Sequence, residues 1–168
     1  MHLPTTSAYR VRLDLSRLGE LSISSAVLDD LPPSVKVFWA HEILEGAAHS
    51  LRMQSNNPLL LHKTTQRSLY DLAWQKAVSL GGFDALFINE RGELTEGGRT
   101  TIFIRPQHSG EWLTPPLSAG VLPGVMRAAI LRDPALKARE ANLTIDDVIG
   151  ANEIMLSNAL RGMIKAHL

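Results

Sequence analysis

The sequence predicts a protein of the α/β or α+β class, because strand-like alternation and helical stripes follow one another along the chain. Residues 10–15 alternate polar and apolar side chains, which is typical of a half-buried strand. Residues 68–80 carry apolar side chains at helical spacing, and Gly81-Gly82 ends that helix. The apolar residues 85–88 indicate a buried strand. We therefore expect a mixed body of helices and strands from about residue 59 onward.

The N-terminal part of the chain predicts strands followed by a linker. Residues 10–15 and 21–24 form a hairpin, and residues 35–39 form a third strand. Residues 41–58 are loosely helical and end in a polar, turn-favouring stretch, so we expect a linker there.

The second half of the chain continues the alternation. Gly92 lies in a turn over residues 89–93, at a position where positive φ is needed. The other expected elements are strands at 94–96, 101–104, 112–114 and 153–156, a helix that begins at Pro123 and reaches Leu131, and a helix capped by Thr144.

Length, charge and composition exclude several classes of function. The chain has 168 residues, the length of one domain, and its 17 Lys and Arg balance 17 Asp and Glu. This balance argues against nucleic-acid and acidic-membrane partners. The absence of cysteine excludes disulfides, Cys-ligated zinc and thiol nucleophiles. Residues 1–10 lack the apolar core of a signal peptide, and no apolar run could span a bilayer, so we expect a cytoplasmic protein.

One segment has the spacing of a metal site. His41, Glu45 and His49 are four residues apart and would share one face of a helix. The zinc-protease pattern requires a second His at i+4, and Glu45 stands there. We expect no metal, and interpret the segment as a solvated linker face.

Lys63 follows the apolar run Leu59-Leu60-Leu61, which indicates a buried strand. A lysine at the end of a buried strand must lower its pKa or find a partner, and a desolvated amine is a nucleophile toward aldehydes. The alternative is a lysine whose ammonium group reaches solvent along its apolar stem.

Two glycine-containing segments suggest ligand contacts. Residues 120–127 (GVLPGVMR) predict backbone that approaches a ligand closely, followed by a helix start whose N–H groups bind phosphate. The alternative is an ordinary junction of loop and helix. Glu96 precedes Gly97-Gly98 at a strand end, where its carboxylate can face a flat ligand or simply serve a turn.

In combination, these segments resemble the class IV family of pyridoxal-phosphate enzymes, which includes branched-chain and D-amino-acid aminotransferases and aminodeoxychorismate lyase. The matching stretches are HKTTQR at 62–67, ERGELTEGGRTTIF at 90–103, TPPL at 114–117, GVLPGVMR at 120–127 and SNALRG at 157–162. The resemblance implies the D-amino-acid aminotransferase-like large domain over residues 59–168, a barrel-like mixed sheet with outer helices. Residues 1–40 resemble a remnant of the family's small N-terminal β domain.

The resemblance also implies pyridoxal 5'-phosphate as the cofactor and assigns the site residues. Lys63 would bind the cofactor covalently and be the catalytic base, and Glu96 would keep the pyridine nitrogen protonated. The phosphate would be bound by the backbone N–H groups of Val125 and Met126, with Ser157 or Asn158 opposite. The substrate carboxylates would be bound by Arg67 and Arg161. Salt bridges within the fold are the alternative role for both arginines.

Within the family, residues 63–67 and 158–162 are most similar to the lyase. The expected reaction converts 4-amino-4-deoxychorismate to 4-aminobenzoate and pyruvate, a step of folate biosynthesis. The alternatives are a class IV aminotransferase acting on branched-chain or D-amino acids, and a catalytically silent fragment or interaction domain.

The resemblance begins inside the family's small domain, so we expect a chain truncated at its N-terminus. The expected partners are a small-molecule substrate, a second copy of the chain in a homodimer, and a missing upstream synthase or small-domain segment. The family's phosphate-binding arginine has no match here, which predicts weak or absent cofactor occupancy.

Overall fold

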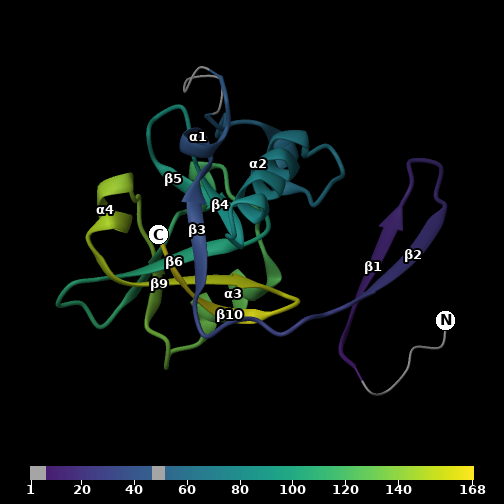
Figure 1. Cartoon of the computed structure of the whole chain (residues 1–168). Helices are drawn as coiled ribbons and strands as arrows, with labels where there is room; N and C mark the ends of the chain where they lie inside the picture. Colours follow the sequence, from purple (N-terminus) through teal and green to yellow (C-terminus); the bar gives the residue numbers. More distant parts are fainter. Residues whose placement is uncertain (1–6, 47–51) are drawn as a thin grey trace. The chain divides into compact units, whose positions relative to one another are not determined.

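The computed structural model describes residues 7–46 and 52–168, which divide into two compact units, Met1–Pro32 and Pro33–Leu168 (Figure 1). The boundary lies at Pro32–Pro33, before the third strand rather than after it, because that strand pairs within the sheet of the second unit. Within the described residues, no helix is long and apolar enough to cross a membrane.

The first unit is an antiparallel hairpin of β1 (Tyr9–Leu15) and β2 (Leu21–Val27), as expected. Its turn is closed by the Ser16 hydroxyl, which accepts hydrogen bonds from the backbone N–H groups of Leu18 and Glu20. The expected half-burial is wrong: a two-stranded ribbon has no second layer within its own unit. The apolar side chains that share one face are all more than half exposed, namely Val11, Leu13, Leu15, Leu21, Ile23 and Val27.

The second unit contains a mixed eight-stranded sheet with the order β5-β4-β3-β10-β9-β6-β7-β8. Its strands are β3 (Val35–Trp39), β4 (Asp84–Ile88), β5 (Leu94–Gly97), β6 (Thr101–Pro106), β7 (Trp112–Thr114), β8 (Ala138–Glu140), β9 (Ala151–Asn158) and β10 (Gly162–His167). β3 runs parallel to both β4 and β10, β7 runs parallel to β8, and the other pairs are antiparallel. The expected mixed sheet is confirmed.

The sheet has to curl because of one short connection. Four strands separate β5 from β6 in the sheet order, a distance of about 24 Å across a flat sheet. The three residues 98–100 join these strands and can span only about 14 Å. The sheet is therefore a curled half-barrel in which the end of β5 lies close to the start of β6.

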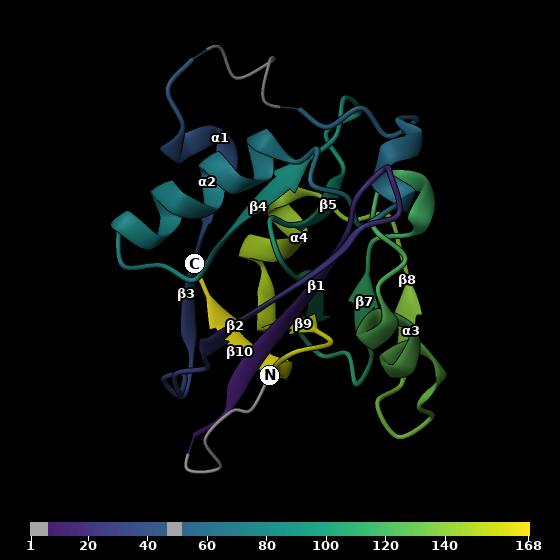
Figure 2. The ribbon, with the colours of Figure 1, turned by 90° about the vertical axis from the view of Figure 1, so that its right-hand side faces the viewer.

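Helices cover the sheet at two places (Figure 2). α2 (Ser68–Ser79) packs on β4 through Ala73 and Ala77, which join Phe87 in one buried cluster. α3 (Val125–Arg132) packs by Ile130 against Phe103 and other core side chains. The remaining helices are short: α1 (Ala40–Ile43), α4 (Ile145–Ile149), and the 3-10 helices η2 (Pro58–Leu61) and η3 (Leu117–Ala119).

One local prediction is wrong. Residues 59–61 form η2 instead of a buried strand, and only Leu60 of the three leucines is buried. Pro58 favours a helical start, and the Asn57 side chain accepts a hydrogen bond from the N–H of Leu59. A short capped turn therefore replaces the strand that the apolar run suggested.

The helix expected to begin at Pro123 begins at Val125, with Gly124 as its N-cap residue. Thr144 caps α4 as expected, in a reciprocal arrangement with Asp147.

Candidate active site

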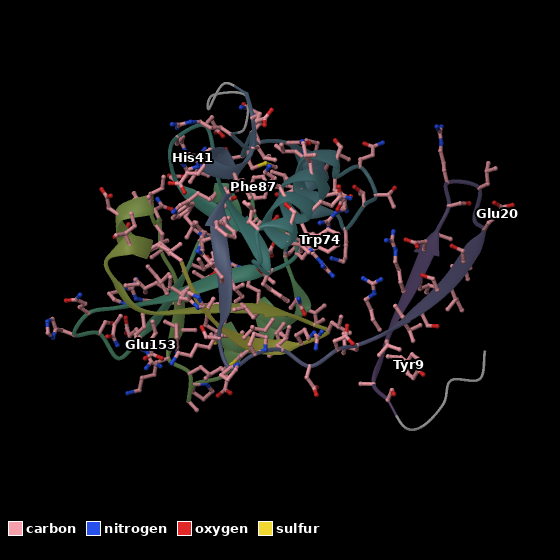
Figure 3. The ribbon with its side chains drawn as sticks, in the orientation of Figure 1. Tyr9, Glu20, His41, Trp74, Phe87 and Glu153 are labelled. Atoms are coloured by element: carbon pink, nitrogen blue, oxygen red, sulfur yellow. The ribbon has the colours of Figure 1, made fainter. Side chains whose placement is uncertain are left out.

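Glu96, near the end of β5, brings three segments of the chain together. Its side chain is buried, and its Oε1 atom accepts a hydrogen bond from the Tyr70 hydroxyl of α2 at 2.9 Å. Its Oε2 atom accepts a hydrogen bond from the backbone N–H of Leu122 at 3.0 Å. The Tyr70 ring is in turn fixed by edge-on packing on Phe87 of β4, with ring centroids 4.7 Å apart. Phe87 is labelled in Figure 3. The carboxylate therefore has a fixed orientation relative to β5, α2 and the segment before α3.

The pKa of Glu96 is raised to about 7, mainly because burial disfavours the charged carboxylate. The two hydrogen bonds and the positive charge of Lys63 oppose this rise, while the negative charge of Asp84 adds to it. A cationic nitrogen placed against this carboxyl group would favour the ionised form. The site thus carries a buried acid that is ready to pair with a positively charged ligand group.

Lys63 lies in an exposed position just after η2 and not at the end of a buried strand. Its ammonium group is nevertheless near enough to Glu96 for its charge to lower the pKa of that carboxyl. The segment before Lys63 is anchored by Leu60, whose Cδ1 atom lies 3.0 Å from where a Cβ on Gly120 would be. Gly120 has φ +92°, so a side chain is disfavoured there by both conformation and space.

The start of α3 has features that suit an anion. Gly124 precedes the helix without a side-chain cap, and Val125 is 77% exposed. The Thr101 hydroxyl of β6 lies 3.5 Å from where a Cβ on Gly124 would be. Ser157 of β9 is paired with Thr101, so both side chains project from the same face of the sheet. The Ser157 hydroxyl is buried and has no hydrogen-bond partner among the described residues.

These features form a continuous group of residues. Glu96 binds the N–H of Leu122, two residues before Gly124, and Gly124 lies beside Thr101, whose strand neighbour is Ser157. A buried polar atom without a partner is costly, which points to a ligand that supplies the missing contact. The group suits a flat ring that has a basic nitrogen facing Glu96 and a phosphate facing the start of α3.

The other expected site residues have contacts within the fold. Arg67 forms a salt bridge with Asp71 at 2.8 Å and donates a hydrogen bond to the carbonyl of Gly98. The Asn158 Oδ1 atom accepts hydrogen bonds from the N–H groups of Leu160 and Arg161, which closes the turn between β9 and β10. The expected ligand contacts of Arg67, Asn158, Arg161 and Met126 remain predictions.

Two residues of the candidate site, Tyr70 and Thr101, are not predicted from the sequence. Tyr70 lies seven residues after Lys63 at the start of α2, where a tyrosine hydroxyl facing a buried acid could not be recognised from spacing alone. Thr101 was interpreted only as part of a strand. The adjacent pair Thr100-Thr101, one residue after Gly97-Gly98, is the one signal that could have indicated a hydroxyl near a ligand.

The described residues contain no cluster of three potential metal ligands. Of the three residues with the spacing of a metal site, His49 lies outside the described residues, while His41 and Glu45 lie within them.

The raised pKa of Glu96 predicts a specific pH dependence of stability. A carboxyl group whose pKa rises from 4.5 to about 7 on folding makes the free energy of unfolding fall as pH rises through that range. Between pH 5 and pH 8 the wild-type protein should lose about 2–3 kcal/mol more than Glu96→Gln, measured by urea unfolding.

Glu90→Gln is the matched control for this measurement. Glu90 is exposed and its pKa is lowered to about 2, so it titrates below the window and its variant should keep the wild-type dependence. An equal pH dependence in Glu96→Gln and the wild type would contradict the assignment of a buried acid at this position.

Comparison with known proteins identifies the family. The family model described as amino-transferase class IV matches residues 7–168. The chain is 28% identical over 172 residues to a Schizosaccharomyces pombe protein named "Putative aminodeoxychorismate lyase", which covers 97% of this chain and 68% of that protein. It is 27% identical to the aminodeoxychorismate lyase of Saccharomyces cerevisiae, over 94% of this chain and 50% of that protein. The chain thus spans between half and about two thirds of these relatives.

Solved structures agree with the curled sheet. A Mesorhizobium loti protein named "Putative amino-acid aminotransferase" has a TM-score of 0.82 and 34% identity, over 98% of this chain and 74% of that chain. A Legionella pneumophila structure named "Putative 4-amino-4-deoxychorismate lyase" has a TM-score of 0.72 at 23% identity, over 87% of this chain and 52% of that chain. The family match over residues 7–168 leads to one conclusion: the chain belongs to the class IV aminotransferases, a family of pyridoxal-phosphate-dependent enzymes.

Proposed function

We propose that this chain is a pyridoxal-phosphate-dependent lyase that converts 4-amino-4-deoxychorismate to 4-aminobenzoate and pyruvate. The observation that carries the proposal is the pairing of a buried, oriented acid with a separate anion-binding group. Glu96 lies at one end of this arrangement, and Thr101, Ser157 and the start of α3 lie at the other. The similarity to two relatives whose names contain aminodeoxychorismate lyase supports the choice of reaction.

The residues of this chain fit the cofactor's two ends. Glu96 would accept a hydrogen bond from the pyridine nitrogen and keep that nitrogen protonated. Burial raises the pKa of Glu96 because it disfavours the charged carboxylate, and a cationic nitrogen beside it would stabilise that charge. The N–H groups of Val125 and Met126 and the unpartnered hydroxyl of Ser157 would bind the phosphate. A protonated ring supplies an electron sink for the substrate carbon.

Lys63 would move the proton in this reaction. Its Nζ atom would remove the proton from the substrate ring carbon that bears the amino group. The carbon–oxygen bond to the enolpyruvyl group then breaks, the ring becomes aromatic, and the leaving enolpyruvate takes up a proton to become pyruvate. Lys63 lies in an exposed position, and its charge reaches Glu96, which would face the cofactor ring.

Arg67 and Arg161 remain the candidate cations for the substrate carboxylates. Arg67 also stacks over the ring of Tyr70, 5.6 Å from its centroid, and so lies next to the residue that orients Glu96. We expect substitutions of Arg67 to affect the stability of the α2 start as well as substrate binding, because its salt bridge and its bond to Gly98 would be lost together.

A second function has its own support. The Mesorhizobium loti protein, which is 34% identical to this chain, is named for amino-acid transamination. In a transaminase, Lys63 would again move the proton, and the cofactor would supply the carrier of the amino group. Amino-acid transamination is therefore the alternative to be tested against the lyase reaction.

The first prediction concerns the covalent attachment of the cofactor. Saturation with pyridoxal phosphate followed by rapid desalting should leave the wild-type protein at least partly yellow, since occupancy is expected to be weak, and borohydride should remove the colour. Lys63→Ala should be colourless. Lys76→Ala is the matched control, since Lys76 is an exposed lysine of α2 outside the site, and should stay yellow. A yellow Lys63→Ala protein or a colourless wild type would contradict the proposal.

The second prediction separates the two reactions. The cofactor-loaded protein, given 4-amino-4-deoxychorismate, should release 4-aminobenzoate and pyruvate in equal amounts, followed by fluorescence and by a pyruvate-coupled assay. Glutamate formation from an amino acid and 2-oxoglutarate, without pyruvate release, would favour the transaminase. A yellow protein with neither activity would support the catalytically silent alternative.

A third prediction concerns a homodimer formed through the second unit, Pro33–Leu168. The two 3-10 helices η2 and η3 are neighbours, because Leu60 packs at Gly120, directly after η3. They expose three leucines, Leu59, Leu61 and Leu117, at 38–50%. Apolar side chains gathered in this way mark interaction surfaces. Dimers are also typical of this fold.

Light scattering should therefore report twice the 18.4 kDa mass of the chain. Leu61→Asp combined with Leu117→Asp should shift the protein to monomer, while Leu18→Asp, in the hairpin turn, should not. A wild-type monomer at micromolar concentration would contradict this prediction.

A further inference from the structure

Asp84, the first residue of β4, is a completely buried acid for which the proposed reaction has no role. Its Oδ2 atom accepts hydrogen bonds from the backbone N–H of Arg99 at 3.0 Å and from the Thr100 hydroxyl at 2.8 Å. Its Oδ1 atom accepts a hydrogen bond from the N–H of Ala85 at 2.9 Å. Burial raises the pKa of Asp84, and these donors together with the charge of Arg99 oppose that rise. A buried carboxyl group with this many donors is held firmly in place.

The segment that Asp84 binds is the short connection that closes the curled sheet. A Cβ on Gly97 would lie 2.6 Å from Asp84 Oδ2, and a Cβ on Gly98 would lie 3.0 Å from Asp84 Oδ1. Both glycines are therefore required by the close approach of this carboxyl group to the backbone. The Gly98 N–H also donates to the carbonyl of Ala85, so the connection is attached to β4 on both sides of its centre.

The two ends of this connection carry the two halves of the candidate site. Glu96 precedes Gly97, and Thr101, which lies beside Gly124 and pairs with Ser157, follows Thr100. The conformation of residues 97–100 thus determines the distance between the Glu96 carboxyl group, which would face the ring nitrogen, and the Thr101 hydroxyl, which would lie near the phosphate. Any loosening of the turn would let these two ends move independently.

We propose that Asp84 is a positioning residue that fixes the separation between Glu96 and Thr101, so that one cofactor molecule can engage both at once. This inference rests on the proposed function, since it takes pyridoxal phosphate as the molecule that spans the two ends. Asp84 itself touches neither substrate nor cofactor in this account. Its effect appears as coupling between the contacts to the ring and the contacts to the phosphate.

The coupling is measurable with two probes, pyridoxal and pyridoxal phosphate, titrated against each protein. The dissociation constant of pyridoxal divided by that of pyridoxal phosphate reports how much affinity the phosphate adds once the ring is bound. In Asp84→Ala this ratio should fall roughly tenfold, while the dissociation constant for pyridoxal itself changes by less than about threefold. Asp84→Asn keeps an acceptor oxygen for Arg99 and Thr100 and should retain most of the ratio.

Val148→Ala is the matched control for a loss of stability without a loss of positioning. Val148 is a buried residue of α4, a different element from Asp84 and residues 97–100, so its truncation should destabilise the protein and leave the ratio unchanged. Should Asp84→Ala fail to fold, Thr100→Val decides, because it removes a single donor to Asp84 in a side chain of the same shape. Its ratio should fall at least threefold.

Two results would overturn the proposal while the proposed function stands. The first is an unchanged ratio in Asp84→Ala, or in Thr100→Val if Asp84→Ala does not fold. The second is an equal loss of affinity for pyridoxal and for pyridoxal phosphate in the same variant. A wild-type protein that binds pyridoxal phosphate no better than pyridoxal would instead refute the proposed function, and this inference with it.

Discussion

Three residues have to join β5 to β6 although four strands lie between them in the sheet. This connection forces the sheet to curl, and the curl brings the end of one edge strand to the start of a strand near the other edge. The buried Asp84 carboxylate occupies the inside of the connection and binds its N–H and hydroxyl groups. Glu96 and Thr101 flank the connection and owe their proximity to it. The candidate site is thus a direct consequence of how the sheet closes.

Burial of Glu96 carries a cost that the free protein only partly offsets. The Tyr70 hydroxyl and the Leu122 N–H each donate to the carboxylate, yet its pKa still rises to about 7. The buried Ser157 hydroxyl adds a further cost, because it has no hydrogen-bond partner among the described residues. Groups that are costly in the free protein and match a ligand are characteristic of functional sites. Ligand binding would therefore stabilise the protein as well as equip it for chemistry.

Much of the body could be predicted from the sequence, because α2, β3, β4 and β6 have strong periodicity or apolar runs. The sequence could not reveal the burial of the hairpin, since alternation describes an apolar face but not what covers it. The apolar run Leu59–Leu61 predicted a strand, but a 3-10 helix forms there because Pro58 and the capping Asn57 favour a helical turn. β10, with alternating burial from Ile164 onward, and the three-residue β8 are marginal as isolated patterns and depend on pairing with β9 and β7.

The candidate site was predictable only in part. Glu96 and the start of α3 are recognisable because glycines adjoin them, and these residues do lie in one connected group. The roles of Tyr70, Asp84 and Thr101 depend on contacts between segments far apart in sequence, which spacing does not encode. The most direct test of the account is mass mapping of the protein after reaction with pyridoxal phosphate and borohydride reduction. We expect the reduced adduct on the peptide that contains Lys63, and an adduct confined to any other lysine would contradict the account.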